Sequence, residues 1–224
     1  MGAIRAVIFD VDGTLVDSND QHARAWVDAL AEMGYPVPYE RIRPLIGMGG
    51  DKVLPLVAGL SAEDGKGKRI AERRDAMFAE RYLPEVRPFP GAHDLLRRLY
   101  TEGFRLAVAS SSKKDLLKRL LKLVGAEDVF EVTTSPDDVD RSKPDPDIVH
   151  VALERLREPA ADVIMIGDTP YDIEAAGHAH VRAIAFRSGG WKDPDLRDAI
   201  EIYDGPLDLL QHFDASVLAA APVH

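Results

Sequence analysis

Short runs of apolar residues alternate along most of the chain with segments whose apolar residues recur at helical spacing. The leucines and valine of 116–124, for example, follow helical spacing and stop at Gly125. Five apolar runs have the length of buried strands: 6–9, 106–109, 129–132, 163–166 and 181–186. Continuously apolar strands that alternate with helices are typical of a parallel sheet covered on both faces. We therefore expect an α/β core with a doubly wound parallel sheet.

Residues 18–85 interrupt this alternation. Apolar positions there predict helices near 20–33, 39–45, 51–57 and 63–82, with no convincing strand between them. We expect two domains, a catalytic core formed by 1–17 and 86–224 and an inserted all-helical domain at 18–85. The return to the core is rich in residues that stiffen or turn the chain and suit a hinge: Pro84, Pro88, Pro90 and Gly91.

Composition narrows the classes of function. The 224 residues are 46% hydrophobic, enough for a sizeable core, and none is cysteine, which excludes disulfides, thiolate zinc and a cysteine nucleophile. A net charge of −10 argues against a nucleic-acid footprint. No apolar stretch approaches a membrane span and no signal segment opens the chain, so we expect a cytoplasmic protein without membrane contact. Oligomeric state cannot be predicted from these features.

Two acids, Asp10 and Asp12, follow the first apolar run in the stretch VIFDVDGTLVDS. Alternate strand residues share a face, so both side chains can point the same way beyond the carboxyl edge, where open parallel sheets bind ligands. Gly13 permits a tight turn, and the amides that follow, with Thr14, are expected to face an anion. The alternative is a strand-ending turn with solvated acids.

The serines after the run 106–109 divide into two expected roles. Ser110 is the first residue beyond the strand and can offer a hydroxyl to a phosphate. Ser112 with Asp115 is similar to an acidic capping box, so we assign Ser112 to the start of the next helix. The alternative for Ser110 is a turn residue.

Lys143 stands immediately before Pro144, which favours an extended conformation. Asp145 and Pro146 then fit the N-cap and first position of a helix. Lysine is thus expected just before a helix start, where it could neutralise both a phosphate and an acid.

Asp168 follows the run 163–166 and Gly167. Thr169, Pro170 and Asp172 fit the N-cap, first and third positions of a helix. Capping alone accounts for Asp172, but it does not account for Asp168.

If these strand ends meet, four acids share one pocket with a single lysine. Two carboxylates about 4 Å apart repel each other by about 4 kcal/mol at an effective dielectric of about 20. Such a cluster needs a cation or a shared proton. Oxygen ligands without cysteine favour Mg²⁺ over zinc.

The order D-x-D-G-T, Ser, Lys-Pro and G-D-x-x-x-D along this chain resembles the haloacid dehalogenase superfamily, and most closely its phosphoglycolate phosphatase and beta-phosphoglucomutase relatives. The resemblance implies a Rossmann-like core with a helical cap, and a Mg²⁺-dependent phosphatase acting on a small phosphorylated metabolite. It implies that Asp10 is the nucleophile that forms an aspartyl-phosphate and that Asp12 is the general acid and base. Ser110 and Lys143 would hold the phosphoryl oxygens. Mg²⁺ would be bound by Asp10, the Asp12 carbonyl and Asp168, with support from Asp172.

The same resemblance suggests substrate contacts from Gly13, Thr14 and Ser111, and from the cap residues His22 and Gly47. We interpret the basic run on a cap helix as a solvated face: Lys66, Lys68, Arg69, Arg73 and Arg74.

Two other functions remain open. A sugar-phosphate mutase similar to beta-phosphoglucomutase would carry basic residues where this chain has Ile46 and Gly50. A receiver-like phosphorylation switch, from another class, also surrounds an aspartate with acids, a hydroxyl and a lysine, but it needs no Asp12 and is shorter than this chain.

Overall fold

The computed structural model describes residues 3–63 and 65–220, and the chain divides into two compact units. One unit, Met1–Asp17 with Pro88–His224, is called the core unit here, and Ser18–Arg87 is called the helical unit. The sequence predicts boundaries after residues 17 and 85, and the units observed change after residues 17 and 87. Short strands β2 (Val16–Asp17) and β3 (Arg87–Pro88) pair where the chain leaves and returns.

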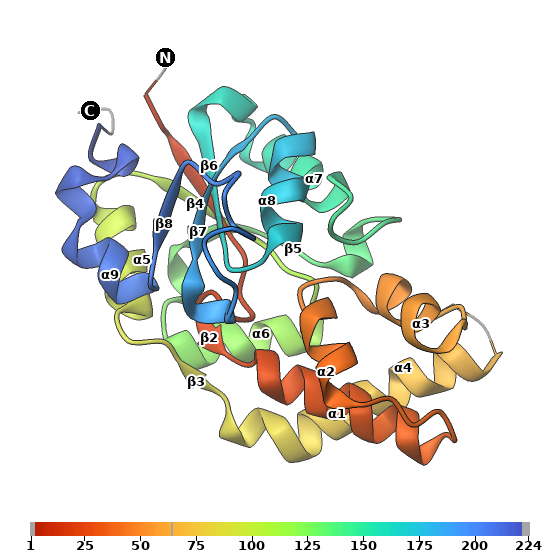
Figure 1. Cartoon of the computed structure of the whole chain (residues 1–224). Coiled ribbons are helices and arrows are strands. Elements are labelled where there is room, and N and C mark those ends of the chain that lie inside the picture. The colour runs from red at the N-terminus through yellow and green to blue at the C-terminus, as the bar shows by residue number, and fades with distance from the viewer. Residues whose placement is uncertain (1–2, 64, 221–224) are drawn as a thin grey trace. The chain divides into compact units, whose positions relative to one another are not determined.

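The core unit contains a six-stranded parallel sheet in the order β5-β4-β1-β6-β7-β8 (Figure 1). Phe9, the last residue of β1, is level with Val108 of β4 and Ile166 of β6. The segments that follow these strands therefore begin at one edge of the sheet. The strands are β1 (Ala6–Phe9), β4 (Arg105–Ala109), β5 (Phe130–Thr134), β6 (Val163–Gly167), β7 (Arg182–Phe186) and β8 (Glu201–Tyr203).

Helices cover both faces of this sheet, which explains why its central strands are apolar throughout. Every residue of β1 and of β6 is buried. Helices α7 and α8 lie on one side and α5 and α9 on the other (Figure 1). This arrangement confirms the predicted doubly wound α/β core. The helices of this unit are α5 (Ala92–Thr101), α6 (Lys114–Val124), α7 (Asp147–Leu156), α8 (Pro170–His178) and α9 (Pro206–Gln211).

The helix ends follow the predicted signals, except at the starts of α6 and α7. Helix α6 ends at Gly125 in the left-handed region, φ 73°, and α8 begins with the predicted capping box of Thr169 and Asp172. Helix α7 starts one residue later than expected, because its N-cap is Pro146 and not Asp145. The Asp145 carboxylate instead lies 3.2 Å from the guanidinium of Arg141.

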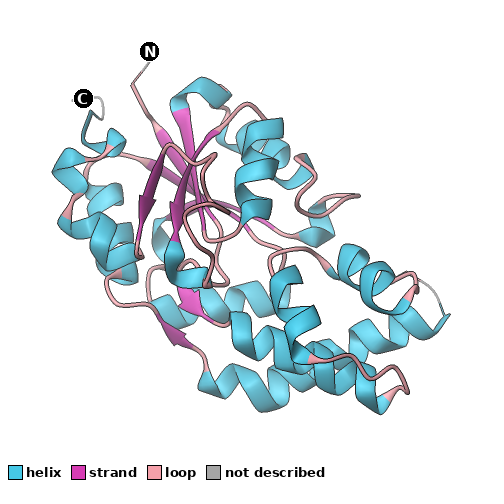
Figure 2. Cartoon of the chain, viewed as in Figure 1, coloured by secondary structure: helices cyan, strands magenta, loops and turns pink. Residues whose placement is uncertain are grey.

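The helical unit packs around a core of its own that includes Trp26, Leu30, Leu54 and Ile70. Figure 2 shows helices and loops between β2 and β3, as the sequence predicts. The expected helix at 63–82 is α4 followed by a π-helical turn, Phe78–Tyr82, while residue 64 lies outside the described residues. The helices are α1 (Asn19–Glu32), α2 (Tyr39–Ile42), α3 (Gly50–Ala58) and α4 (Gly65–Met77).

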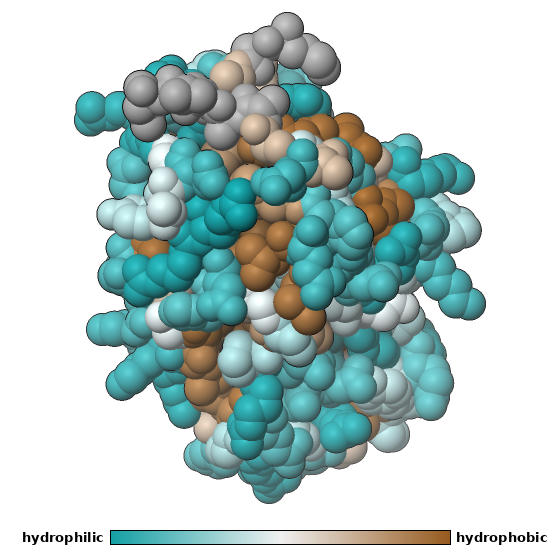
Figure 3. Space-filling view, turned by 90° about the vertical axis from the view of Figure 1, so that its left-hand side faces the viewer, coloured by the Kyte–Doolittle hydropathy of each residue, from teal (hydrophilic) through white to brown (hydrophobic). Residues whose placement is uncertain are grey.

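The surface seen in Figure 3 is mostly hydrophilic, with apolar residues in separate patches. Among the described residues, no helix has the length and apolar character needed to cross a lipid bilayer.

Candidate active site

Asp10 begins the loop that follows β1 and is nearly buried, with 6% of its surface exposed. Its backbone amide donates to Ile166 at 2.9 Å, so pairing with β6 continues one residue beyond the strand and fixes the start of the loop. Its side chain accepts two hydrogen bonds, from Lys143 Nζ at 2.6 Å and from Thr14 Oγ1 at 3.2 Å. The two carboxylate oxygens of Asp10 are thus hydrogen-bonded to residues from different segments of the chain.

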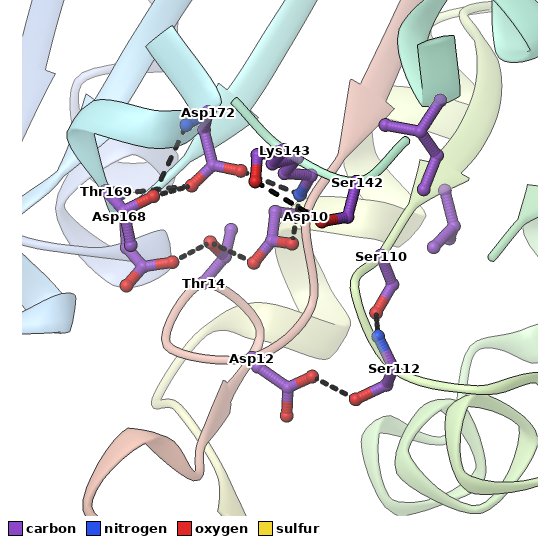
Figure 4. Close-up of polar contacts among 12 residues, drawn as sticks. Asp10, Asp12, Thr14, Ser110, Ser112, Ser142, Lys143, Asp168, Thr169 and Asp172 are labelled. Carbon is purple, nitrogen blue, oxygen red and sulfur yellow. Dashed lines mark hydrogen bonds and ion pairs between the residues drawn. The ribbon is translucent and has the colours of Figure 1, made fainter. Parts of the chain in front are cut away.

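Lys143 lies between two acids, as Figure 4 shows. Its ammonium nitrogen is 2.6 Å from Asp10 Oδ1 and 2.7 Å from Asp172 Oδ1, and the residue is 1% exposed. Burial alone would lower the pKa of Lys143, but the carboxylates of Asp10 and Asp172 outweigh it and raise that pKa above its usual value. Lys143 therefore stays cationic at neutral pH.

Thr14 and Asp172 connect the loops after β1 and β6. The Thr14 hydroxyl lies 2.8 Å from Asp168 Oδ1 and 3.2 Å from Asp10 Oδ2, so its one proton is shared between the two acids. Asp172 Oδ2 accepts from the amide and the hydroxyl of Thr169 while its Oδ1 accepts from Lys143. The capping role and the contact with Lys143 use different oxygens of one carboxylate.

Gly167 makes room for this carboxylate. A Cβ on Gly167 would lie 2.5 Å from the Cβ and 2.6 Å from the Cγ of Asp172. The glycine that precedes Asp168 is therefore required by close approach.

Asp10, Asp168 and Asp172 form a buried cluster in which one carboxylate oxygen from each lies within 4.8 Å of the others. Burial is the largest cause that raises the pKa of Asp10 well above its usual value, Lys143 opposes this shift, and the neighbouring aspartates add to it. Three buried carboxylates around one lysine leave excess negative charge, and their all-oxygen donor set fits a hard divalent cation such as Mg²⁺.

The Asp12 side chain lies apart from this cluster (Figure 4). Its Oδ2 accepts a 2.7 Å hydrogen bond from Ser112 Oγ. The assignment of Ser112 to a capping box was wrong, because the N-cap of α6 is Lys113 and the first amide of the helix, that of Lys114, donates to Asp137 Oδ2 at 3.1 Å. Ser112 is therefore a site residue that the capping pattern concealed.

Ser110 is fully buried, and its hydroxyl accepts the Ser112 amide at 3.0 Å. Its own amide donates to Thr134 at 3.2 Å, which extends the pairing of β4 with β5. Ser111, between them, is half-buried. The serine loop is thus fixed by its backbone beside the loop that carries Asp12 (Figure 4).

The amides after Asp12 do not serve the role that was expected of them. Gly13 adopts φ 81° and donates its amide to Val16, while Thr14 donates its amide to Val11. Both amides are used inside the turn, so the prediction that they face an anion is wrong. Thr14 contributes its side chain to the acids instead.

His22 and Gly47 belong to the helical unit. His22 is 2% exposed and stacks on Phe78 with ring centroids 3.9 Å apart. Its Nδ1 lies 2.5 Å from Arg74 Nη2, and because a guanidinium only donates, His22 Nδ1 is the acceptor. Gly47 adopts φ 113° before α3, a conformation that favours glycine.

Arg74 corrects the interpretation of the basic run as a solvated face. Its guanidinium lies 5.3 Å from the centroid of the Trp26 ring and 5.6 Å from that of Phe78, and its side chain is only 15% exposed. Lys66, Lys68 and Arg69 are exposed as predicted. Arg73, also in the run, forms a two-point ion pair with Glu32.

Comparisons with known proteins give the following relatives. A family model described as haloacid dehalogenase-like hydrolase matches residues 7–186. "Probable phosphatase IndB" of Dickeya dadantii is 34% identical over 186 residues, covering 82% of this chain and 81% of the relative. "Pyrophosphatase PpaX" of Listeria monocytogenes is 28% identical over 184 residues, covering 80% and 81%. The crystal structure of a hydrolase from Pseudomonas syringae matches with a TM-score of 0.87 and 32% identity over 94% of this chain and 98% of that one.

Proposed function

The chain belongs to the haloacid dehalogenase-like hydrolase family, and we propose that it is a Mg²⁺-dependent phosphatase that acts on a small phosphorylated metabolite through an aspartyl-phosphate at Asp10. The observation that carries this proposal is the surroundings of Asp10. Its carboxylate is held between Lys143 and Thr14 beside two further buried acids. The relative named as a phosphatase supports the same class of reaction.

In the first step, an Asp10 carboxylate oxygen attacks the phosphorus of the substrate, and the bond from phosphorus to the leaving oxygen breaks. The electron pair of that bond goes to the leaving oxygen. Lys143 lies within hydrogen-bond distance of Asp10 Oδ1 and would neutralise phosphoryl oxygens placed beside that atom. Ser110, at the end of β4, would bind another phosphoryl oxygen.

Asp12 would supply the proton that the leaving oxygen needs. Its carboxyl group is separated from the acid cluster and oriented by Ser112, so it can act on the leaving group while Asp10 acts on phosphorus. In the second step Asp12 takes a proton from water, and the water oxygen attacks the aspartyl-phosphate. The bond between phosphorus and Asp10 breaks, which releases orthophosphate and restores the carboxylate.

The cation would be held by Asp10, Asp168 and the Asp12 carbonyl, with Asp172 supporting them. Once bound, Mg²⁺ would supply the positive charge that lets an anionic carboxylate approach an anionic phosphate. The excess of buried acids over ammonium groups in this cluster is the feature that supports such a role.

The candidate substrates are phosphate monoesters and inorganic pyrophosphate, because one relative is named a phosphatase and another a pyrophosphatase. Mutase activity is disfavoured by Ile46 and Gly50, which replace the basic residues expected of such an enzyme. A receiver-like switch is disfavoured by the family match across 7–186.

The test is phosphate release from p-nitrophenyl phosphate, inorganic pyrophosphate and a panel of phosphorylated metabolites, in Mg²⁺ and in EDTA. We expect release that requires Mg²⁺ and disappears in Asp10→Asn. Release that is unaffected by EDTA, or that persists in the folded Asn variant, would contradict the proposed mechanism.

A further inference from the structure

The turn that follows β7 contacts both loops that carry the acids of the core unit. This turn, Arg187–Gly189, is a single 3₁₀ turn that ends at Gly190 with φ 89°. Its first residue is anchored outward, because the Arg187 guanidinium forms ion pairs with Asp193 at 2.6 Å and with Asp204 at 2.7 Å. Its other two residues reach inward.

Ser188 contacts the loop of the proposed nucleophile. Its hydroxyl donates a 2.6 Å hydrogen bond to the carbonyl oxygen of Gly13, 175 residues away in the chain. Gly13 lies between Asp12 and Thr14 and takes a left-handed conformation, φ 81°. A hydrogen bond to its carbonyl therefore fixes the peptide plane between Gly13 and Thr14, the threonine whose hydroxyl binds Asp10.

Gly189 contacts the loop after β6. A Cβ on Gly189 would lie 1.9 Å from Asp168 Oδ2 and 2.7 Å from Asp168 Cγ, far closer than van der Waals contact allows. Its backbone is not in the left-handed region, so space alone excludes a side chain there. The missing side chain lets the turn lie directly against the Asp168 carboxylate.

The two contacts meet at Thr14. Ser188 holds Gly13, the next residue Thr14 donates to Asp168 Oδ1 at 2.8 Å, and Asp168 Oδ2 lies against Gly189. These contacts connect Ser188 through both acidic loops to Gly189, the next residue of the same turn. A movement of the turn therefore shifts both loops together.

We infer that Ser188 and Gly189 are positioning residues, Ser188 for the Asp10–Thr14 loop and Gly189 for the Asp168 carboxylate. The expected effect on kcat rests on the proposed function, whereas the positioning of the two loops rests on the contacts alone. Ser188 affects how the nucleophile and acid are aligned, and Gly189 affects how well the acids accept a cation.

The first experiment compares Ser188→Ala and Ser188→Thr with the wild type. We expect kcat to fall about tenfold in the Ala variant, because displacing a reacting group by a fraction of an ångström is costly, while KM and the Mg²⁺ concentration for half-maximal rate change less than twofold. The Thr variant retains the hydroxyl and should recover most of kcat. Ser216→Ala is the matched control, since Ser216 also donates to a backbone carbonyl, that of Phe213, at 2.7 Å.

An unchanged kcat in Ser188→Ala would overturn the role of Ser188, as would a loss of melting temperature with kcat intact, which is the pattern expected of Ser216→Ala. A Thr variant as slow as the Ala variant would also count against the hydroxyl.

The second experiment measures Mg²⁺ binding without turnover, by the rise in melting temperature of the EDTA-treated protein on titration with MgCl₂. Gly189→Ala should raise the Mg²⁺ concentration needed for half the maximal rise at least tenfold, because Asp168 must move. Gly177→Ala is the control, since a Cβ there meets nothing within 4 Å. Unchanged Mg²⁺ binding in Gly189→Ala would overturn the role of Gly189.

A double-mutant cycle keeps the test decisive if Gly189→Ala proves too unstable to titrate. The clash is with the Asp168 side chain, so Gly189→Ala should lower the melting temperature much less in an Asp168→Gly background. Equal losses in both backgrounds would refute the steric argument. Neither this cycle nor the Mg²⁺ titration requires turnover. If the wild type released no phosphate, the proposed function would be wrong, but these two measurements would still show whether Gly189 positions Asp168.

Discussion

Lys143 donates a 2.6 Å hydrogen bond to Asp10, although the two residues are 133 positions apart in the chain. Both are buried, and the same ammonium group is 2.7 Å from Asp172. The proposed nucleophile is thus paired with a cation, and the cation with an acid from a third segment. Three predictions follow from this cluster and from its neighbours, and a fourth concerns the helical unit.

Asp10→Asn should abolish phosphate release and stabilise the cation-free protein at neutral pH. Burial, opposed by Lys143, raises the pKa of Asp10 in the folded state above its unfolded value of about 3.9, so the wild type loses stability as pH rises from about 4 through the folded pKa. Asparagine has no such loss. In EDTA at pH 7.5 the variant should melt about 2–4 °C above the wild type, equivalent to about 1 kcal/mol.

The control for that measurement is pH itself. Near pH 4 the difference in melting temperature should shrink, because Asp10 is then protonated in the folded wild type as well. A variant that melts below the wild type at pH 7.5 and equals it at pH 4 would show that ionisation of Asp10 stabilises the folded protein, which contradicts the prediction.

Lys143→Met should destabilise the cation-free protein by about 3–5 kcal/mol, because it leaves the carboxylates of Asp10 and Asp172 buried without their shared partner. Urea unfolding in EDTA measures the loss, and MgCl₂ should restore part of it. Lys192→Met removes an exposed lysine and should change little. A loss below about 1 kcal/mol for Lys143→Met would mean that the acids do not depend on the ammonium group.

Ser112→Ala should lower kcat about tenfold for alkyl phosphates, because Ser112 orients the Asp12 carboxyl group through a 2.7 Å hydrogen bond. The loss should be smaller for p-nitrophenyl phosphate, whose leaving phenolate needs little help from an acid. Asp12→Asn should show the same dependence on the leaving group, only larger. Equal losses on both substrates would assign Ser112 to phosphate binding.

Arg74→Ala should destabilise the helical unit by about 1–2 kcal/mol, because the guanidinium packs over the rings of Trp26 and Phe78 and hydrogen-bonds His22. The fluorescence of Trp26 during urea unfolding, in a Trp191→Phe background, reports on this unit. Lys68→Ala, at an exposed position of the same helix, should leave the transition unchanged. A similar effect from both substitutions would restore the interpretation of a solvated basic face.

The strand ends and their convergence could be predicted because each strand is a continuous apolar run and because parallel strands end at a common edge. Asp10, Lys143, Asp168 and Asp172 do meet there. Strand β8 was not predicted, because Glu201–Tyr203 is three residues long and only partly buried at the edge of the sheet. Its pairing with β7 is a tertiary contact without a local pattern.

Ser112 and Arg74 were misassigned because a local pattern competed with a distant contact. Ser112 has the spacing of a capping box with Asp115, but its partner, Asp12, is 100 residues away. Arg74 belongs to a charged run, although a signal was present: Ile70 and Phe78, four residues on either side of it, are both fully buried. Helical spacing therefore places Arg74 on the buried face.

The central position of β1 has a consequence for how the protein is made. Its partners in the sheet, β4 and β6, begin at Arg105 and Val163, so the first strand to be synthesised has no partner until β4 has been made and lacks its second partner until β6 has been made. Asp172, the last acid of the cluster, comes later still. A chain released before that point carries the proposed nucleophile without all of its neighbours, so the acid cluster can be complete only in a chain that extends at least through Asp172.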